Sequence, residues 1–247
     1  HRWATMYCLS KLGDVAKPAI SEYLSYLGDS NFNLQVIACR ALAEQGQDAK
    51  AAIPKLIELT QKKGNVLSTR THAAMCLGAI GPVDPEVNLV ELFKAMIAEP
   101  NAFCQERGLI ALGRLGKHAS SAAEFVVGLF ENEDFSQRPE AALTLWQITG
   151  DGKRSVELLR PLMSNMTYDL RALEVIQTIG PAAAEMADEV AKYLESEDAS
   201  LQLMAAEALV AMGVAEKYLE RLRTLPDQAP PDIAIELDSI IQGLERG

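Results

Sequence analysis

The sequence predicts an all-α fold: a right-handed α-solenoid (superhelix) of about seven two-helix repeats, closed by a C-terminal capping helix. Two observations lead to this prediction. Glycine recurs at intervals of 30 to 35 residues, and small and large apolar residues recur at helical spacing before each of these glycines. The clearest copy, residues 33–59, has the pattern of a helix, a glycine stop and a second helix.

Each repeat carries the same packing pattern in front of its glycine. The residue four positions before the glycine is large and apolar and the residue eight positions before it is small, so both lie on one helical face. The small residue lets a neighbouring helix approach, and the large one fills the space beside it. The glycines are Gly13, Gly46, Gly81, Gly116, Gly150, Gly180 and Gly213. The small residues are Thr5, Ala38, Ala73, Gly108, Ala142, Ala172 and Ala205; the large ones are Leu9, Leu42, Leu77, Leu112, Trp146, Ile176 and Leu209.

This register predicts every element in order. We expect first helices near 2–12, 33–45, 68–80, 103–115, 138–149, 169–179 and 200–212. Second helices are expected at about 17–28, 50–62, 85–98, 119–131, 154–164, 182–195 and 215–224. The predicted repeats are 1–29, 30–64, 65–101, 102–134, 135–166, 167–198 and 199–225, with a capping region at 226–247. We predict no internal boundary, so residues 1–247 form one solenoid.

Four stretches resemble HEAT repeats, in particular the short HEAT-like repeats of bilin lyases and of many bacterial and archaeal proteins. They are ACRALAEQGQDAKAAIPKL at 38–56, AAMCLGAIG at 73–81, LIALGRLGKHASSAAEF at 109–125 and AAEALVAMG at 205–213. The resemblance covers nearly the whole chain and implies a scaffold that binds along a ridge or a concave face. A few members of the family are enzymes, and the family has no common catalytic motif to carry over.

Composition excludes several classes of partner. The net charge is −11, and residues 181–247 hold 14 acidic residues against 5 basic ones. Because an acidic surface repels phosphate groups, we expect no nucleic-acid partner. No apolar stretch approaches the roughly 20 residues that span a bilayer, so we expect no membrane partner.

The spacing of the cysteines favours a role in core packing over metal binding or disulfide formation. Cys8, Cys39, Cys76 and Cys104 form no CxxC pair, and we expect them to pack as small hydrophobic residues. Free cysteines slightly favour the cytoplasm, and the compartment is otherwise unknown. The chain begins at His1 with helical spacing under way by Ala4, which suggests a segment of a larger polypeptide.

No motif for catalysis or cofactor binding is present. The phosphate-binding, dinucleotide-binding, zinc-protease and serine-hydrolase patterns are all missing. His1, His72 and His118 have no clustered partner at metal-ligand spacing. We therefore expect no catalytic residue, no cofactor, no metal site and no enzymatic activity.

One periodic feature suggests a binding surface. An acidic residue recurs early in each expected second helix, beginning with Glu22, and second helices line the concave face of HEAT solenoids, so stacking would align the carboxylates. The candidate partner-binding residues are Glu58, Glu91, Glu124, Glu157, Glu189 and Glu220. The alternative is structural, because a carboxylate near a helix N-terminus is stabilised by the macrodipole by about 0.3–1 kcal/mol.

These observations predict a non-enzymatic protein–protein interaction scaffold, or an accessory repeat domain of a larger protein, that binds along its concave second-helix face. The expected partner is a protein: another domain of the same polypeptide or a basic segment. Two alternatives stay open. One is a lyase-type or nucleic-acid-acting enzyme, or a subunit of one, built on such repeats. The other is a structural spacer, which predicts no exposed aromatic patch on either face.

Overall fold

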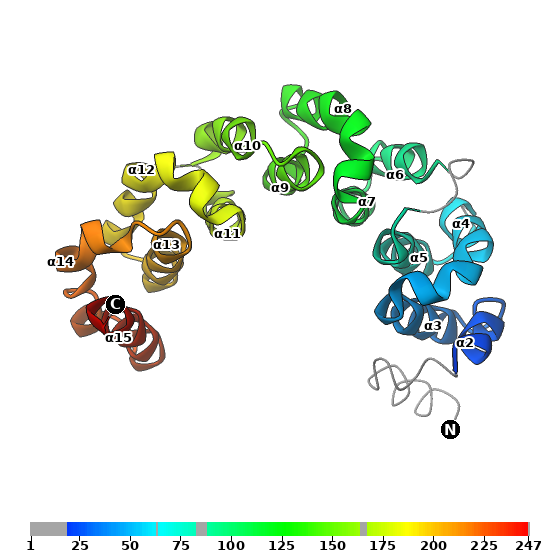
Figure 1. Cartoon of the computed structure of the whole chain (residues 1–247), viewed down its shortest axis with the longest axis horizontal. Coiled ribbons are helices and arrows are strands. Elements are labelled where there is room, and N and C mark those ends of the chain that lie inside the picture. The colour runs from blue at the N-terminus through cyan, green and yellow to red at the C-terminus, as the bar shows by residue number, and fades with distance from the viewer. Residues whose placement is uncertain (1–18, 63, 83–87, 164–166, 247) are drawn as a thin grey trace. The chain divides into compact units, whose positions relative to one another are not determined.

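The computed structural model describes residues 19–62, 64–82, 88–163 and 167–246 (Figure 1). Every regular element within these ranges is helical and none is a strand, which confirms the all-α prediction. The expected helix at 2–12, together with Gly13 and Cys8, lies outside the described residues.

The first helices begin and end within one residue of the predicted positions. They are α3 (Phe32–Glu44), α5 (Leu67–Ile80), α7 (Ala102–Arg114), α9 (Arg138–Thr149), α11 (Asp169–Ile179) and α13 (Ala199–Ala211). Several begin at a side chain that accepts a hydrogen bond from the first turn. Asn31 accepts from the amide of Asn33, and Asn101 accepts from that of Cys104, each at 3.0 Å. Such caps satisfy amides that have no partner inside the helix.

The second helices are less regular than predicted, because several begin or end as 3₁₀-helix. They are α2 (Ile20–Tyr26), η2 (Gly46–Ala52) with α4 (Ile53–Gln61), α6 (Leu89–Ile97), η3 (Gly116–Ala122) with α8 (Ala123–Gly128) and η4 (Leu129–Glu131), α10 (Gly152–Leu159) with η5 (Arg160–Leu162), η6 (Gly180–Met186) with α12 (Ala187–Ala191) and η7 (Lys192–Glu195), and η8 (Ala215–Tyr218) with α14 (Leu219–Leu222). The tighter 3₁₀ winding carries the chain away from the glycine. It also buries small side chains such as Ala49 and Ala52.

The glycines end the first helices as predicted, because each described one has a positive φ. The φ values are 51° at Gly46, 84° at Gly81, 56° at Gly116, 76° at Gly150, 66° at Gly180 and 73° at Gly213. A residue with a Cβ is strained in this region, so glycine is the residue that reverses the chain here at least cost.

The small-then-large pattern lies in the core. The small residues of the described first helices are buried, and so are the large ones except Trp146, which is half-buried. At Gly108 even a Cβ is too large, because it would lie 2.8 Å from the Ile97 side chain. A Cβ on Gly78 would lie 2.8 Å from the carbonyl oxygen of Ala111, so α5 and α7 meet with their backbones nearly in contact.

The described residues belong to two compact units. Unit 1 comprises His1–Gln137 and Gln147–Thr149, and unit 2 comprises Arg138–Trp146 and Gly150–Gly247. In unit 1, α3, α5 and α7 pack side by side, and α2, α4 and α6 each pack onto the first helix of the next repeat (Figure 1). The predicted single solenoid over 1–247, with its repeat boundaries, stays a prediction.

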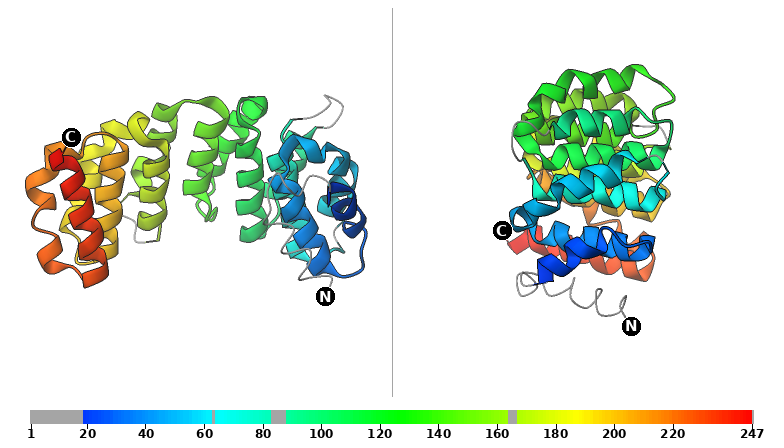
Figure 2. Two further views of the ribbon diagram at one scale, coloured as in Figure 1. Left: turned by 60° about the horizontal axis from the view of Figure 1, so that its bottom comes forward. Right: turned by 90° about the vertical axis from the view of Figure 1, so that its right-hand side faces the viewer.

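Unit 2 repeats this arrangement and ends in a terminal helix. Its α11 packs against α13, and α12 packs onto α13. The last helix, α15 (Pro231–Arg246), follows η9 (Pro226–Gln228) and lies beside α13 (Figure 2). It lies within the predicted capping region and buries Leu237 and Ile241, whereas Ile235 is exposed.

A recurring polar contact was not predicted. In three described repeats, a glutamine eleven positions before the stop glycine donates a hydrogen bond to a carbonyl of the preceding linker. These contacts are Gln35 to Asp29 (2.8 Å), Gln105 to Glu99 (3.0 Å) and Gln202 to Ser196 (2.7 Å). In α5 the same position is Arg70, which donates from Nε to the carbonyl of Thr60 at 3.1 Å and forms a two-pronged ion pair with Glu99.

The positive φ of the stop glycines gives a matched test. Cβ atoms added at Gly116 and Gly128 both meet no atom within 4 Å, but φ is 56° at Gly116 and −60° at Gly128. We expect Gly116→Ala to lower the free energy of unfolding by about 1–2 kcal/mol. Gly128→Ala should leave it unchanged or raise it by up to about 1 kcal/mol. Urea unfolding followed by circular dichroism measures both, and equal effects would contradict the assigned stop.

The Arg70–Glu99 pair gives a second test. The Arg70 side chain is 11% exposed, so Glu99→Gln leaves a nearly buried cation without its counter-charge. We expect a loss of about 1–3 kcal/mol in unfolding free energy, by the same measurement. The control is Glu91→Gln, because the Glu91 side chain is 61% exposed and pairs with Lys94 on its own helix. Its effect should stay below about 0.5 kcal/mol, and a control as damaging as Glu99→Gln would rule out this account.

Candidate partner-binding surface

The candidate glutamates lie on the second helices, divided between the two units. Three belong to unit 1 and three to unit 2: Glu58 on α4, Glu91 on α6, Glu124 on α8, Glu157 on α10, Glu189 on α12 and Glu220 on α14. Glu91, Glu124, Glu189 and Glu220 are in the first turns of their helices, as is Glu22 in α2. Glu58 and Glu157 lie further along, so helix-dipole stabilisation does not extend to them.

Most of these carboxylates have a local cationic partner. Glu58 pairs with Lys55 at 2.8 Å, Glu91 with Lys94 at 2.8 Å and Glu220 with Arg223 at 2.5 Å, each three residues apart on one helix or its end. Glu189 pairs with Arg160. The hydrogen bond from Lys55 lowers the pKa of the Glu58 carboxyl. Pairs this exposed contribute little stability, and they reduce the charge available to a partner. That these glutamates bind a partner stays a prediction.

Two of the six glutamates line hollows. Glu91 lines a hollow of about 470 Å³ in unit 1, together with Thr60, Arg70 and Glu99. Glu189 lines one of about 240 Å³ in unit 2, beside Arg160 and Tyr193. Glu91 and Glu189 therefore line two separate hollows and not one shared site.

A different hollow crosses three first helices of unit 1. It has a volume of about 470 Å³, and its lining comes from α3, α5 and α7, which pack side by side. The lining residues are Cys39, Arg40, Ala43, Glu44, Thr71, His72, Met75, Cys76, Ala79, Arg107 and Arg114. The small side chains of Ala43 and Ala79 create a depression, and long side chains on the neighbouring helices form its walls. We call this surface the first-helix face of unit 1.

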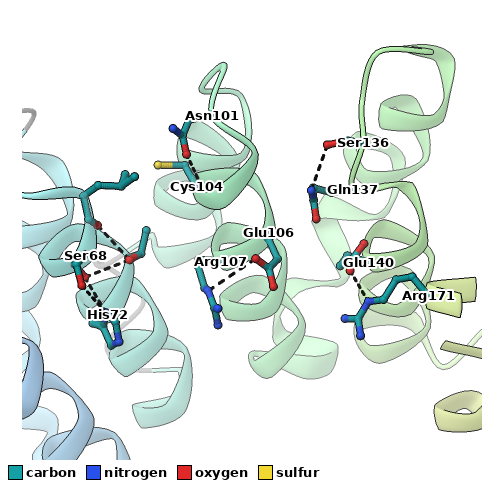
Figure 3. Close-up of polar contacts among 12 residues, drawn as sticks. Ser68, His72, Asn101, Cys104, Glu106, Arg107, Ser136, Gln137, Glu140 and Arg171 are labelled. Atoms are coloured by element: carbon teal, nitrogen blue, oxygen red, sulfur yellow. Dashed lines mark hydrogen bonds and ion pairs between the residues drawn. The ribbon is translucent and has the colours of Figure 1, made fainter. Parts of the chain in front are cut away.

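The charged lining of this face is mainly basic, with three arginines against one glutamate, Glu44. Arg114 donates to the carbonyl of Met75 at 3.0 Å, which ties α7 to α5. Arg107 lies over the ring of Phe103, with its guanidinium carbon 4.9 Å from the ring centroid. Its nearest carboxylate is Glu106, at 3.9 Å (Figure 3). Stacking on the ring holds the guanidinium in place while it keeps its charge.

His72 has a fixed orientation in this lining. Its Nδ1 lies 2.7 Å from the carbonyl oxygen of Ser68 and 3.4 Å from the Ser68 hydroxyl (Figure 3). A contact that short to a carbonyl requires Nδ1 to carry a proton and donate it. Nδ1 is therefore not the base for the Ser68 hydroxyl, and the Ser68–His72 contact orients the ring.

The thiols beneath this face are unreactive. Cys39 and Cys76 are fully buried and free, and Cys104 in α7 is also buried and free. Burial raises the pKa of the Cys39 thiol to about 12 and that of Cys76 well above its usual value. A protonated, buried thiol is a poor nucleophile, so these residues pack as hydrophobic side chains, as predicted.

The described residues contain no group of three or more His, Cys, Asp or Glu side chains placed to hold a metal ion. Among the helices that the structure describes, none is both long enough and apolar enough to cross a membrane.

Apolar side chains stay exposed at the starts of the same three first helices. Phe32 begins α3 and is 44% exposed, Leu67 begins α5 and is 36% exposed, and Phe103 in the first turn of α7 is 38% exposed. We call these three residues the apolar row. These residues were not predicted as a binding site from the sequence, although Phe32 and Leu67 occupy the same position in their repeats, fourteen residues before Gly46 and Gly81.

Comparisons with known proteins do not assign this chain to a family. No protein-family model matches the chain, and no curated protein matches it. One engineered protein of known structure is similar with 18% identity and a TM-score of 0.41, over 92% of this chain and 96% of that one. A second engineered protein has 20% identity and a TM-score of 0.46, over 97% and 74%. Human deoxyhypusine hydroxylase has 19% identity and a TM-score of 0.37, over 100% and 90%. All three TM-scores are below 0.5, so these likenesses carry no argument, and the HEAT family stays a resemblance.

The prediction that the chain has no enzymatic activity is corrected by this comparison. Human deoxyhypusine hydroxylase, whose structure is among the similar ones, is an enzyme. A helical-repeat fold therefore does not exclude catalysis, and the missing sequence motifs were too narrow a basis for that prediction. At a TM-score of 0.37 the likeness does not show that this chain is an enzyme.

Proposed function

We propose that the chain is a protein-binding module: a right-handed solenoid of about seven HEAT-like repeats with a C-terminal cap, which holds a segment of another protein or of another domain of its own polypeptide. The proposed binding surface is the first-helix face of unit 1 with the apolar row beside it. This surface replaces the second-helix carboxylates as the preferred site, because most of those are paired locally.

The observation that carries the proposal is the apolar row. Phe32, Leu67 and Phe103 begin three helices that pack side by side, so they lie along one edge of the unit. With helix axes about 10 Å apart, the row extends over about 20 Å. Single exposed apolar residues are ordinary, but exposed apolar residues in the first turns of three adjacent helices are typical of an interaction site. A structural spacer predicts no such row.

The hollow supplies the second element of a binding surface, and it meets the row where Arg107 lies over Phe103. Protein interfaces combine apolar anchors with polar groups, and arginine and aromatic residues are enriched in them. Met75, Ala43 and Ala79 offer apolar surface in the hollow, and Arg40, Arg107 and Arg114 offer donors. A segment lying across α3, α5 and α7 would contact both elements.

The test is selection from a phage-displayed library of random peptides on the immobilised chain. We expect the parent to enrich binding peptides, and the double variant Leu67→Ser, Phe103→Ser to bind synthetic versions at least about tenfold more weakly, because exposed anchors dominate such interfaces. The matched control is Glu58→Gln, Glu91→Gln, Glu124→Gln on the second helices of the same unit, which should bind like the parent.

Thermal melting checks that each variant is folded. If the triple Glu→Gln variant loses binding and the double Ser variant binds like the parent, the binding site lies on the second helices and not on the first-helix face. If the folded parent enriches no peptide, the proposal is wrong and the spacer alternative is favoured.

A further inference from the structure

We infer that the segment bound on the first-helix face of unit 1 is acidic, with carboxylates that pair with Arg40, Arg107 and Arg114 and an apolar side chain that enters the hollow between them. This inference rests on the proposed function and names the chemistry of the partner. It reverses the expectation from the sequence, which was a basic segment on an acidic surface.

The first argument is that Arg40 and Arg114 have no carboxylate partner within the described structure, and that Arg107 has only a long ion pair with Glu106. Arg40 is exposed and makes no ion pair with a described residue, and the hydrogen bond of Arg114 goes to a neutral carbonyl. Arg107 has only a carboxylate at 3.9 Å, and its Nε is buried with no hydrogen-bond partner among the described residues. Several arginines elsewhere pair with carboxylates, as Arg70 does with Glu99 and Arg223 with Glu245, whereas Arg246 donates to the carbonyl of Gln242.

The second argument is the contrast with the rest of the chain. The net charge is −11, yet three arginines and one glutamate line this hollow. In unit 2 a hollow across α13 and α15 has the opposite charge, because it is lined by Glu207 and Glu236 and by no lysine or arginine. These two hollows therefore differ in the sign of their charge, and charge complementarity assigns the first-helix face of unit 1 an anionic occupant.

The overall negative charge does not outweigh this local field. At physiological ionic strength the Debye length is about 8 Å, so exposed charges beyond that distance are largely screened. A carboxylate in contact with Arg40 or Arg114 interacts mainly with the charges nearest to it. The net charge slows the approach of an acidic segment, whereas the arginines determine whether it stays bound.

The spacing of the helices limits the size of the occupant. Three helices about 10 Å apart present the arginines over about 20 Å. This is the length of about 13 residues of α-helix or about 6 residues of extended chain. A short acidic segment with one or two large apolar residues fits these limits, and its apolar residues would lie against Met75 and Ala79.

The experiment uses the full chain and synthetic peptides taken from the selected pool. Each acidic peptide is compared with its amide counterpart, in which Asp becomes Asn and Glu becomes Gln. We expect the acidic form to bind at least about tenfold more tightly, and its affinity to fall as salt rises. Arg40→Glu with Arg114→Glu should weaken it at least about tenfold. The matched control, Lys62→Glu with Lys117→Glu, changes the net charge equally outside the hollow and should change affinity less than about twofold.

If the double variant fails to fold, Arg40→Glu alone is tested instead, because Arg40 is exposed and makes no described contact that the fold needs. Equal binding of the amide counterpart, or equal loss in the lysine control, would overturn the acidic partner and leave the proposed function standing. Tighter binding of a short double-stranded DNA than of any acidic peptide, lost in Arg40→Glu, would replace the acidic segment with a nucleic acid. If no peptide binds the folded parent, the proposed function itself fails.

Discussion

The close approach of successive first helices is the constraint on which the rest of the structure depends. Small residues such as Ala73 and Gly108 lie where neighbouring helices meet, and at Gly78 the backbones of α5 and α7 leave no room for a methyl group. The positive-φ glycine at the end of each described first helix reverses the chain, so that the first helix of the next repeat can pack equally closely. Side chains separated by more than thirty residues in the sequence are thereby brought to one surface, and the hollow across α3, α5 and α7 results from this packing.

The two helical layers of unit 1 use their charges differently. On the second helices, glutamates pair with lysines of the same helix, as Glu58 does with Lys55 and Glu91 with Lys94. On the first-helix face, Arg40 and Arg114 have no carboxylate partner among the described residues. The layer with satisfied charges is suited to solvent, and the layer with unsatisfied charges beside exposed Leu67 and Phe103 is suited to a partner.

The fold could be predicted from the sequence because its signals are local. The glycine register placed every described first helix within one residue, since small, large and glycine positions all fall within one helix. The 3₁₀ segments were missed because their apolar spacing resembles that of an α-helix. The candidate site was not predictable in this way. The hollow needs side chains from three repeats, whereas the Lys55–Glu58 pair, three residues apart on one helix, could have been predicted from the sequence.

The most direct test of the central claim is hydrogen–deuterium exchange of the full chain, with and without a selected acidic peptide. The account predicts slower exchange in Phe32–Glu44, Leu67–Ile80 and Ala102–Arg114, with the amide counterpart of the peptide producing little change. Slower exchange confined to the second helices of unit 1 or to unit 2, with none in these three helices, would contradict it.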